Sequence, residues 1–371
     1  MEPPMDEKKQ FFELTNEQRR FFALPIVSEG SFRLALDPSP YDRYDTVGYA
    51  EGNHLYKLVQ SGEEYNGHYF YNEYQVDAVL SDDYRLILPK KAGKPKRLTA
   101  SSAEKLTGIG MRLLHNGDFV ILDNLSTQQT YYSTAYEDGT GTSLESFQRF
   151  IIQWCSDSTQ RDLDSVNAFA VKDRVHVKYR EGDYFRFKIG RRLYGYGRIL
   201  LDVNLLRKKK AEFWDCYMTK PLIVAVYHIV TERTDVSVEE LENLMMLPSQ
   251  AIMDNALFYG DFEIFDNRPI NESITDYPIN YGESFGLRDH TMYYQQGRLC
   301  LKADGSEDFP WKDDFRNVGI GSNLDLSLPI LLACIREKSN LPYWEKYGRE
   351  DLRNPKYHRE LLTIREKFGL L

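Results

Sequence analysis

Two closely spaced glycines in residues 182–200, GDYFRFKIGRRLYGYGRIL, have the residue types of a phosphate-binding loop. Such a loop needs a further glycine and must run into a helix, whose N-terminal amides hold the phosphate. Here the third residue after Gly197 is Leu200, and the chain continues as the strand-like ILLDV. The segment GTGTS at 139–143 does precede a helical pattern, but it lacks the lysine of a Walker motif. Neither segment predicts a nucleotide site.

The residues that hold metals or act as nucleophiles are dispersed along the chain. The seven histidines form no HxH or HExxH spacing, no GxSxG elbow is present, and the four cysteines form no CxxC pair. Asp289 and His290 are adjacent, and neighbours on a strand point to opposite faces. We therefore predict no metal, no cofactor and no enzymatic activity, although a catalytic group assembled from distant residues stays open.

The glycines of GYGR fit a β-hairpin better than a loop. Phe185, Phe187 and Ile189 alternate with polar residues, which is the period of a strand with one apolar face. A three-residue turn over 190–192 would oppose Phe187 to Gly195 and Phe185 to Gly197, and opposed residues share a face. Each ring would then shield a strand glycine. A two-residue turn would instead set the glycines among charged residues, so the three-residue turn is favoured.

The other face of this hairpin is predicted to point outward and to be available to a partner. It carries Tyr194, Tyr196 and Arg198, and aromatic and arginine side chains are the residues most enriched at protein interfaces. Four acidic residues further along the chain form a second candidate contact set: Asp254, Asp261, Glu263 and Asp266.

Charge supports a protein partner more than a nucleic acid. The 371 residues carry a formal net charge of −9, whereas nucleic-acid binding needs clustered lysine and arginine. One local basic cluster exists within the hairpin region 186–210, with tyrosines interleaved. Its members are Arg186, Lys188, Arg191, Arg192, Arg198, Arg207, Lys208, Lys209 and Lys210. Binding of nucleic acid through this region therefore remains an alternative, and a basic protein partner is favoured.

Short apolar and aromatic runs dominate both halves of the chain, so the fold class predicted is α+β. We expect two mostly antiparallel, β-rich domains with a few flanking helices, covering 1–160 and 165–371. The polar segment 156–165 carries no apolar period, and we place the domain boundary there. Before it, Thr142 and Glu145 suggest a capping box. The helix that follows carries an apolar stripe of Phe147, Phe150, Ile151 and Trp154.

Nothing in the sequence predicts a membrane-bound or exported protein. The N-terminal residues MEPPMDEKKQFFEL contain no apolar signal region. The longest apolar run, 221–230, has about half the roughly twenty residues that a membrane span needs. We therefore predict a cytoplasmic location.

Several segments of the second half, taken in order, resemble the immunity protein 26 family. They are EGDYFRFKIGRRLYGYGRILLD, IVAVYH, FYGDFEIFDNRPI, YPINYGES and IREKFGL, and the resemblance covers about residues 165–371. The matching positions, which we interpret as mostly fold-determining, are Gly182, Asp183, Phe185, Gly195, Tyr196, Gly197, Arg198, Tyr259, Gly260, Pro278 and Gly282.

This resemblance implies a bacterial immunity protein. The family occurs beside toxins in polymorphic toxin systems and is expected to be mostly β and to neutralise a cognate toxin by binding it. A basic nuclease would suit the net charge, and occlusion of its active site is the mechanism expected. The family also carries a phosphotriesterase label, so a metal-dependent hydrolase stays open as an alternative. The first half, through HNGDFVILDN and the helix after it, resembles SMI1/KNR4-type immunity proteins.

Overall fold

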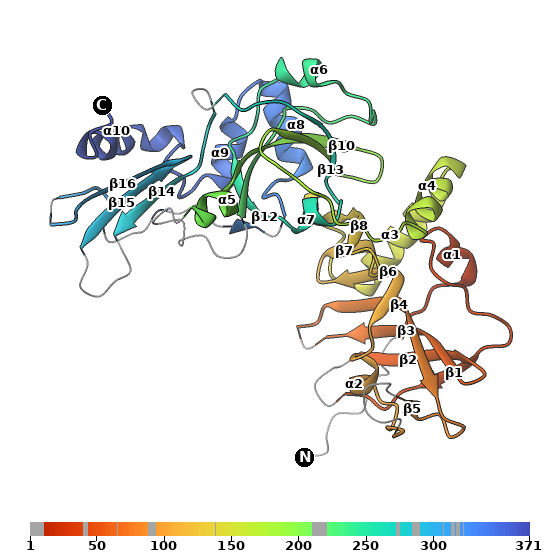
Figure 1. Ribbon diagram of the computed structural model, residues 1–371. Coiled ribbons are helices and arrows are strands. Elements are labelled where there is room, and N and C mark those ends of the chain that lie inside the picture. The colour runs from red at the N-terminus through yellow and green to blue at the C-terminus, as the bar shows by residue number, and fades with distance from the viewer. Residues whose placement is uncertain are drawn as a thin grey trace. The chain divides into compact units, whose positions relative to one another are not determined.

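The computed structural model describes residues 11–39, 44–64, 66–87, 94–137, 139–209, 221–271, 275–283, 290–306, 308–312, 316, 320–321 and 323–371. The chain divides into two compact units, residues 1–175 and 176–371. Both units combine helices with mostly antiparallel sheets, which confirms the α+β fold class (Figure 1). Within the described residues, no helix has the length and apolar character needed to cross a membrane.

The first unit is built on one eight-stranded antiparallel sheet in the order β1-β2-β3-β4-β6-β7-β8, with β5 paired to β4. Its strands are β1 (Phe32–Ala35), β2 (Asp45–Glu51), β3 (His54–Glu63), β4 (Tyr69–Leu80), β5 (Leu86–Ile87), β6 (Gly108–Asn116), β7 (Phe119–Asn124) and β8 (Gln129–Ser133). Its helices are α1 (Asn16–Arg20), α2 (Ala100–Ala103), the 3-10 turn η1 (Thr134–Tyr136), α3 (Leu144–Ser156) and α4 (Gln160–Ala170).

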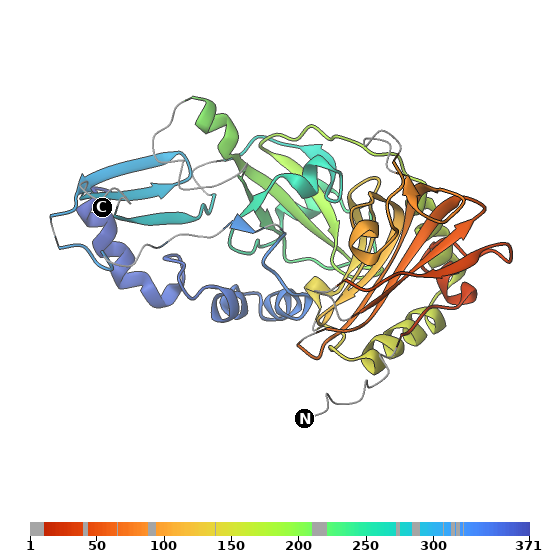
Figure 2. The same cartoon turned by 90° about the horizontal axis from the view of Figure 1, so that it is seen from below.

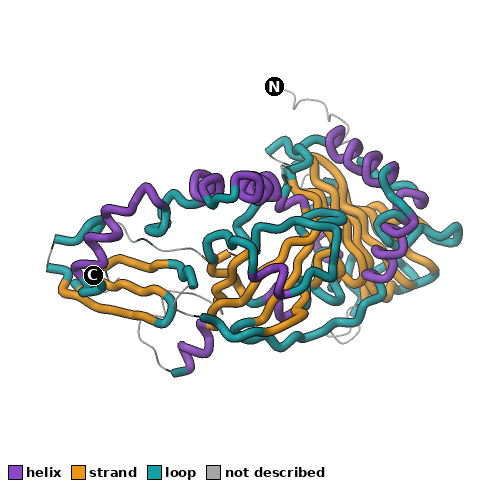
Figure 3. The backbone as a smooth tube through the Cα atoms, turned by 90° about the horizontal axis from the view of Figure 1, so that it is seen from above, coloured by secondary structure: helices purple, strands orange, loops and turns teal. Residues whose placement is uncertain are grey.

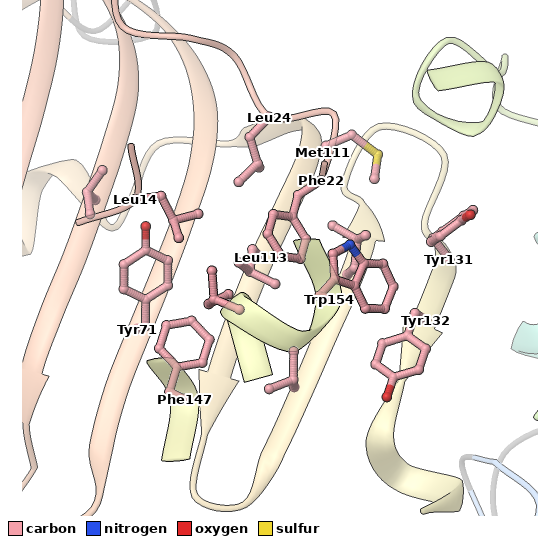
Figure 4. Close-up of a cluster of buried hydrophobic side chains, with 14 of the residues drawn as sticks. Leu14, Phe22, Leu24, Tyr71, Met111, Leu113, Tyr131, Tyr132, Phe147 and Trp154 are labelled. Atoms are coloured by element: carbon pink, nitrogen blue, oxygen red, sulfur yellow. The ribbon is translucent and has the colours of Figure 1, made fainter. Parts of the chain in front are cut away.

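Helices α3 and α4 supply one wall of the core of this unit. Phe147, Ile151 and Trp154 of α3 are buried against the sheet, and Phe150 packs beside them, so the predicted stripe is confirmed. Figure 4 shows Phe147 and Trp154 directed at side chains of the strands and of the N-terminal segment. The capping box lies one residue later than expected, at Ser143 with Ser146, because it is Ser143 whose backbone is extended before the first turn.

The segment 156–165, where the sequence places the domain boundary, is largely helical. It holds the end of α3 and the first part of α4, which begins after a capping box of Thr159 and Asp162. Val166 and Phe169 of α4 are buried in the core of the first unit. The polar run shows no apolar period because the buried apolar residues of α4 lie in the second half of the helix, beyond that run.

The second unit contains two sheets. One follows the order β13-β9-β10-β11-β12-β17, with only β12 and β17 parallel, and the other follows β14-β15-β16. The first sheet contains β9 (Asp183–Lys188), β10 (Tyr194–Asp202), β11 (Pro221–Val226), β12 (Gln250–Met253), β13 (Glu263–Asn267) and β17 (Ile320–Gly321). The second contains β14 (Ile279–Glu283), β15 (Thr291–Gln296) and β16 (Leu299–Asp304).

The helices of the second unit lie between its strands and at its C-terminal end. They are α5 (Val203–Lys208), α6 (Val238–Glu242), α7 (Asn255–Phe258), α8 (Leu328–Glu337), α9 (Leu341–Tyr347), the 3-10 turn η4 (Pro355–Tyr357) and α10 (His358–Lys367). Leu361 and Ile364 of α10 pack against Tyr281 and Tyr294 of the three-stranded sheet. Figures 2 and 3 show α10 lying along one side of these strands.

Candidate functional site

The hairpin of β9 and β10 has the predicted register and no phosphate loop. Phe187 pairs with Gly195 and Phe185 with Gly197, and the N–H of Ile189 donates to the carbonyl of Leu193 at 3.0 Å across the three-residue turn. A Cβ added at Gly195 would lie 2.5 Å from the ring of Phe187, so the rings do cover the glycines. The glycines are packing features, and β10 continues through them as a regular strand.

The prediction that Tyr196 points outward is wrong. Its side chain is 0% exposed and lies in a core cluster with Val236, Val238 and Leu241, residues at and around α6. Its hydroxyl donates to the carbonyl of Arg233 at 2.7 Å. Strand alternation correctly separated the two faces of the hairpin, but the segment around α6 covers the second face, and no local pattern in β10 could indicate that cover.

The other two members of the predicted row are also engaged within the unit. The guanidinium of Arg198 lies 4.5 Å from the ring centre of Tyr184, and its Nη2 donates to the carbonyls of Arg268 and Pro269 at 2.7 and 2.9 Å. The backbone of Tyr194 exchanges hydrogen bonds with Thr231. The row therefore joins β10 to the chain segments around it, and its role toward a partner stays a prediction.

The predicted acidic residues divide into a buried and an exposed group. Asp254 is buried and accepts a hydrogen bond from the hydroxyl of Tyr179 at 2.6 Å, while Asp261 is half-buried before β13. Glu263 and Asp266 lie exposed on β13. Among the strands in the described part of the chain, β13 is hydrogen-bonded only to β9, so both carboxylates stand at a sheet edge. The structure thus places Glu263 and Asp266 on the same exposed edge strand.

Helix α6 adds carboxylates that the sequence analysis did not single out. Ser237 caps this helix, and Glu239, Glu240 and Glu242 are exposed on it. The carboxylate of Glu239 accepts hydrogen bonds from the backbone N–H of Glu239 and from the guanidinium of Arg268. Both hold the pKa of Glu239 below its usual value, so this side chain is charged at neutral pH. Ser237 followed by Glu240 is a local signal for the start of a helix, but sequence spacing cannot place that helix beside β13.

Two arginines connect α6 to the sheet edge. Arg268, directly after β13, forms ion pairs with Glu239 and, at 3.3 Å, with Glu242. Arg186 of β9 holds both oxygens of Glu263, at 2.7 and 3.0 Å, and also donates to the carbonyl of Thr234 before α6. Bidentate pairs of this kind fix the direction of a carboxylate as well as its position.

We call the resulting region the α6–β13 surface. Its exposed or half-exposed members are Glu239, Glu240, Glu242, Glu263, Asp266, Arg186, Arg233 and Arg268. Carboxylates outnumber guanidinium groups on it, so its potential is negative overall. Beneath it, the hydroxyl of Tyr184 donates to Glu242 at 3.0 Å, and burial raises the pKa of Tyr184, which keeps it a neutral donor.

The basic cluster does not form one open patch. Arg186 and Arg198 are bound to protein groups as described, and the ammonium of Lys188 donates to the carbonyl of Arg191 at 3.2 Å. Arg207 and Lys208 lie apart from these residues, on α5. Lys210 lies outside the described residues. Within the described part of the chain, these basic residues therefore do not form a continuous cationic surface that would support nucleic-acid binding.

The described residues offer no metal site that would support the hydrolase alternative. Among the residues that the structure describes, no group of three or more His, Cys, Asp or Glu side chains is placed to hold a metal ion. The buried His228, which lies in a strand-like run of the sequence, instead places Nε2 2.7 Å from the amide oxygen of Asn340. Burial lowers the pKa of His228, so it is a neutral hydrogen-bond donor.

Comparison with known proteins gives one family. Residues 180–290 match the family model of immunity protein 26, which confirms the resemblance seen in the second half. The resemblance of the first half to SMI1/KNR4-type proteins is not borne out. No curated protein and no solved structure matches the chain. Every member of the α6–β13 surface falls within the matched residues.

Proposed function

We propose that this protein is a bacterial, cytoplasmic immunity protein that binds a cognate toxin and neutralises it by covering its active site. The match of residues 180–290 to immunity protein 26 supports this function. Within the chain, we assign toxin binding to residues 165–371 and treat residues 1–160 as a separate module. The observation that carries the proposal furthest is the α6–β13 surface, an ordered and mainly acidic surface inside the matched segment.

The charge of this surface favours a basic toxin, such as a nuclease. An enzyme that handles nucleic acid presents cationic groups around its active site, and complementary carboxylates raise the rate of encounter and fix the docking orientation. Arg186 and Arg268 already hold Glu263, Glu239 and Glu242 in place. Less side-chain entropy is then lost on binding than with free carboxylates. No catalytic step by the immunity protein is needed for this inhibition.

The test uses the full chain and the toxin domain encoded beside its gene. Calorimetry should give a stable complex, and co-expression should restore growth of cells that produce the toxin. Replacing both exposed carboxylates of β13, Glu263→Lys with Asp266→Lys, should weaken binding by about tenfold or more and reduce its salt dependence. The matched control is Asp77→Lys, an exposed carboxylate of the first unit, which should bind as the wild type does.

Three results would count against this function. If the wild-type chain does not bind that toxin domain, the proposed function is wrong. Bound zinc with turnover of a phosphotriester would favour the hydrolase instead, and salt-dependent binding of RNA or DNA with no toxin binding would favour the nucleic-acid alternative.

A further inference from the structure

Three large aliphatic side chains are exposed next to the acidic helix α6. Leu244 and Met245, directly after the helix, are 36% and 46% exposed, and Leu341 at the start of α9 is 51% exposed. Single exposed aliphatic residues are ordinary on protein surfaces and need no explanation. Here two are consecutive, and the third belongs to a distant segment that is hydrogen-bonded to theirs through Asn340 and Met246. We call this set the aliphatic patch.

A hydrogen-bonded bridge holds the two segments of the aliphatic patch together. The N–H of His228 donates to the carbonyl of Met245 at 2.8 Å, and the side-chain amide of Asn340 donates to the carbonyl of Met246 at 2.9 Å. His228 and Asn340 are themselves joined at 2.7 Å. Leu341 follows Asn340 directly, so the patch belongs to a fixed part of the fold rather than to a free loop.

Other apolar residues of the same run fill the core below the aliphatic patch. The buried neighbours Leu241 and Leu247 fill the core below, and Met246 is partly buried there as well. Leu244 and Met245 are the apolar residues of this run that are exposed. The apolar area that they leave in water gains stabilisation only when a partner covers it.

The border of the aliphatic patch is acidic on the side of α6. Glu242 lies two residues before Leu244, and Glu239 and Glu240 lie on the turn before it, all three exposed. An apolar centre with a charged rim is the anatomy of a specific protein interface, in which the centre supplies most of the binding energy and the rim supplies orientation.

We propose that the aliphatic patch is the apolar centre of the toxin-binding surface. The toxin then presents an apolar pocket for Leu244 and Met245, bordered by lysine and arginine side chains that meet the carboxylates of α6. This inference rests on the proposed function and extends the contact area from the α6–β13 surface to the start of α9.

Charge distinguishes this partner from the other candidate occupants. In a two-fold dimer of this chain, the same surface meets itself, so α6 of one copy would approach α6 of the other and their carboxylates would repel. An anionic membrane surface would repel the same carboxylates. A basic protein with an apolar pocket is the partner that complements both the acidic rim and the apolar centre.

The test compares four forms of the full chain, the wild type included, for binding to the toxin domain encoded beside its gene. The double variant Leu244→Ala with Met245→Ala should bind about tenfold or more weakly, chiefly through faster dissociation, because apolar contacts form after the charge-steered encounter. The matched control is Leu299→Ala, which truncates a leucine of similar exposure on β16 and should bind as the wild type does. Thermal unfolding of all forms should coincide, and Leu341→Ala provides a second variant on a different segment.

The outcomes separate this inference from the function beneath it. If the double variant and Leu341→Ala both bind the toxin domain as tightly as the wild type does, the aliphatic patch is not part of the binding surface. The immunity function would not be affected by that result. Failure of the wild-type chain to bind rejects the function and the patch together. Sedimentation that shows a dimer lost in the double variant would assign the patch to self-association and overturn the inference.

Discussion

The cluster around Glu73 in the first unit and the α6–β13 surface of the second unit use charged residues in opposite ways. In the first unit, Arg19, Lys57 and Glu73 are almost fully buried and bound to one another, whereas in the second unit Glu239 and Glu263 stand more than half exposed beside their arginines. A buried charge is committed to the fold, because removing its partner leaves it without water or compensation. An exposed charge is worth little to the fold and remains available to a partner.

The buried cluster of the first unit is centred on one carboxylate. Oε1 of Glu73 accepts from Nζ of Lys57 and from Nε of Arg19, both at 2.7 Å, and Oε2 accepts from the hydroxyl of Tyr71 at 2.5 Å. Lys57 also donates to the carbonyl of Pro25. These contacts attach the N-terminal segment with α1 to the middle strands of the sheet, so the charges act as an internal tie.

The largest effect is expected for Glu73→Gln. This variant keeps the shape of the side chain but leaves Lys57 and Arg19 without their shared anion, which should cost about 3–5 kcal/mol of the free energy of unfolding of the first unit. Hydrogen exchange of the β3 and β4 amides in the full chain measures it. The β9 and β10 amides should exchange as in the wild type, and the exposed control Glu63→Gln should change neither. A cost below about 1 kcal/mol would contradict the contrast between buried and exposed charge.

A smaller loss is expected in the apolar interior of the second unit. Gly195→Ala places a methyl group against the ring of Phe187 and should cost about 1–3 kcal/mol. Phe187→Leu makes room, so the double variant should lose less than the sum of the two single losses. Denaturant unfolding of the four forms gives this coupling directly, and strictly additive losses would show that the ring does not cover the glycine.

Alkaline pH should recover part of the loss in Glu73→Gln. Burial lowers the pKa of Lys57, so the unfolded chain binds more protons than the folded one below the ordinary lysine pKa, and stability rises with pH in that range. Glu73 raises the pKa of Lys57, so its removal lowers that pKa further in the folded state. The pH range over which stability rises with pH then extends to lower pH in the variant. The difference in unfolding free energy between variant and wild type should therefore narrow from pH 7 to about 9.5, below the ordinary lysine pKa near 10.4. A constant difference would mean that Lys57 is not the destabilising charge.

The smallest effect is expected at the exposed pair of Arg186 and Glu263. Glu263→Gln should change the stability of the second unit by about 0–1 kcal/mol, because water and salt screen the pair. Hydrogen exchange of the β9 and β13 amides measures the change, and 0.5 M salt should erase it. A larger loss of unfolding free energy that does not depend on salt would mean that this pair stabilises the fold as the buried Glu73 cluster does.

Local patterns predicted much of the hairpin and little of its surroundings. Alternation and turn length alone gave the pairing of Phe187 with Gly195, because strand register is a short-range property. The same alternation assigned Tyr196 to an outward face, and this was wrong because residues from Val236 to Leu241 cover it. Which element covers a sheet face depends on chain segments tens of residues away.

The candidate site shows the same division. Charge along the sequence selected Glu263 and Asp266, and both are exposed on one strand, but it also selected Asp254, which is buried against Tyr179. It did not select Glu239 or Glu242, which the fold brings to the same arginine, Arg268. Composition reports how many carboxylates a segment has, and only the packing of α6 beside β13 decides which of them share a surface.

The sequence by itself determined the α+β class, the glycine-on-ring hairpin and the resemblance to immunity protein 26. These follow from side-chain alternation, turn chemistry and the order of local motifs, which act over a few residues. Tertiary structure alone decided that Tyr196 is buried, that Arg19 and Lys57 meet Glu73, and that Asn340 binds the carbonyl of Met246. Each of these rests on a contact between distant segments, and such contacts are fixed by the burial of whole faces, which no short stretch of sequence records.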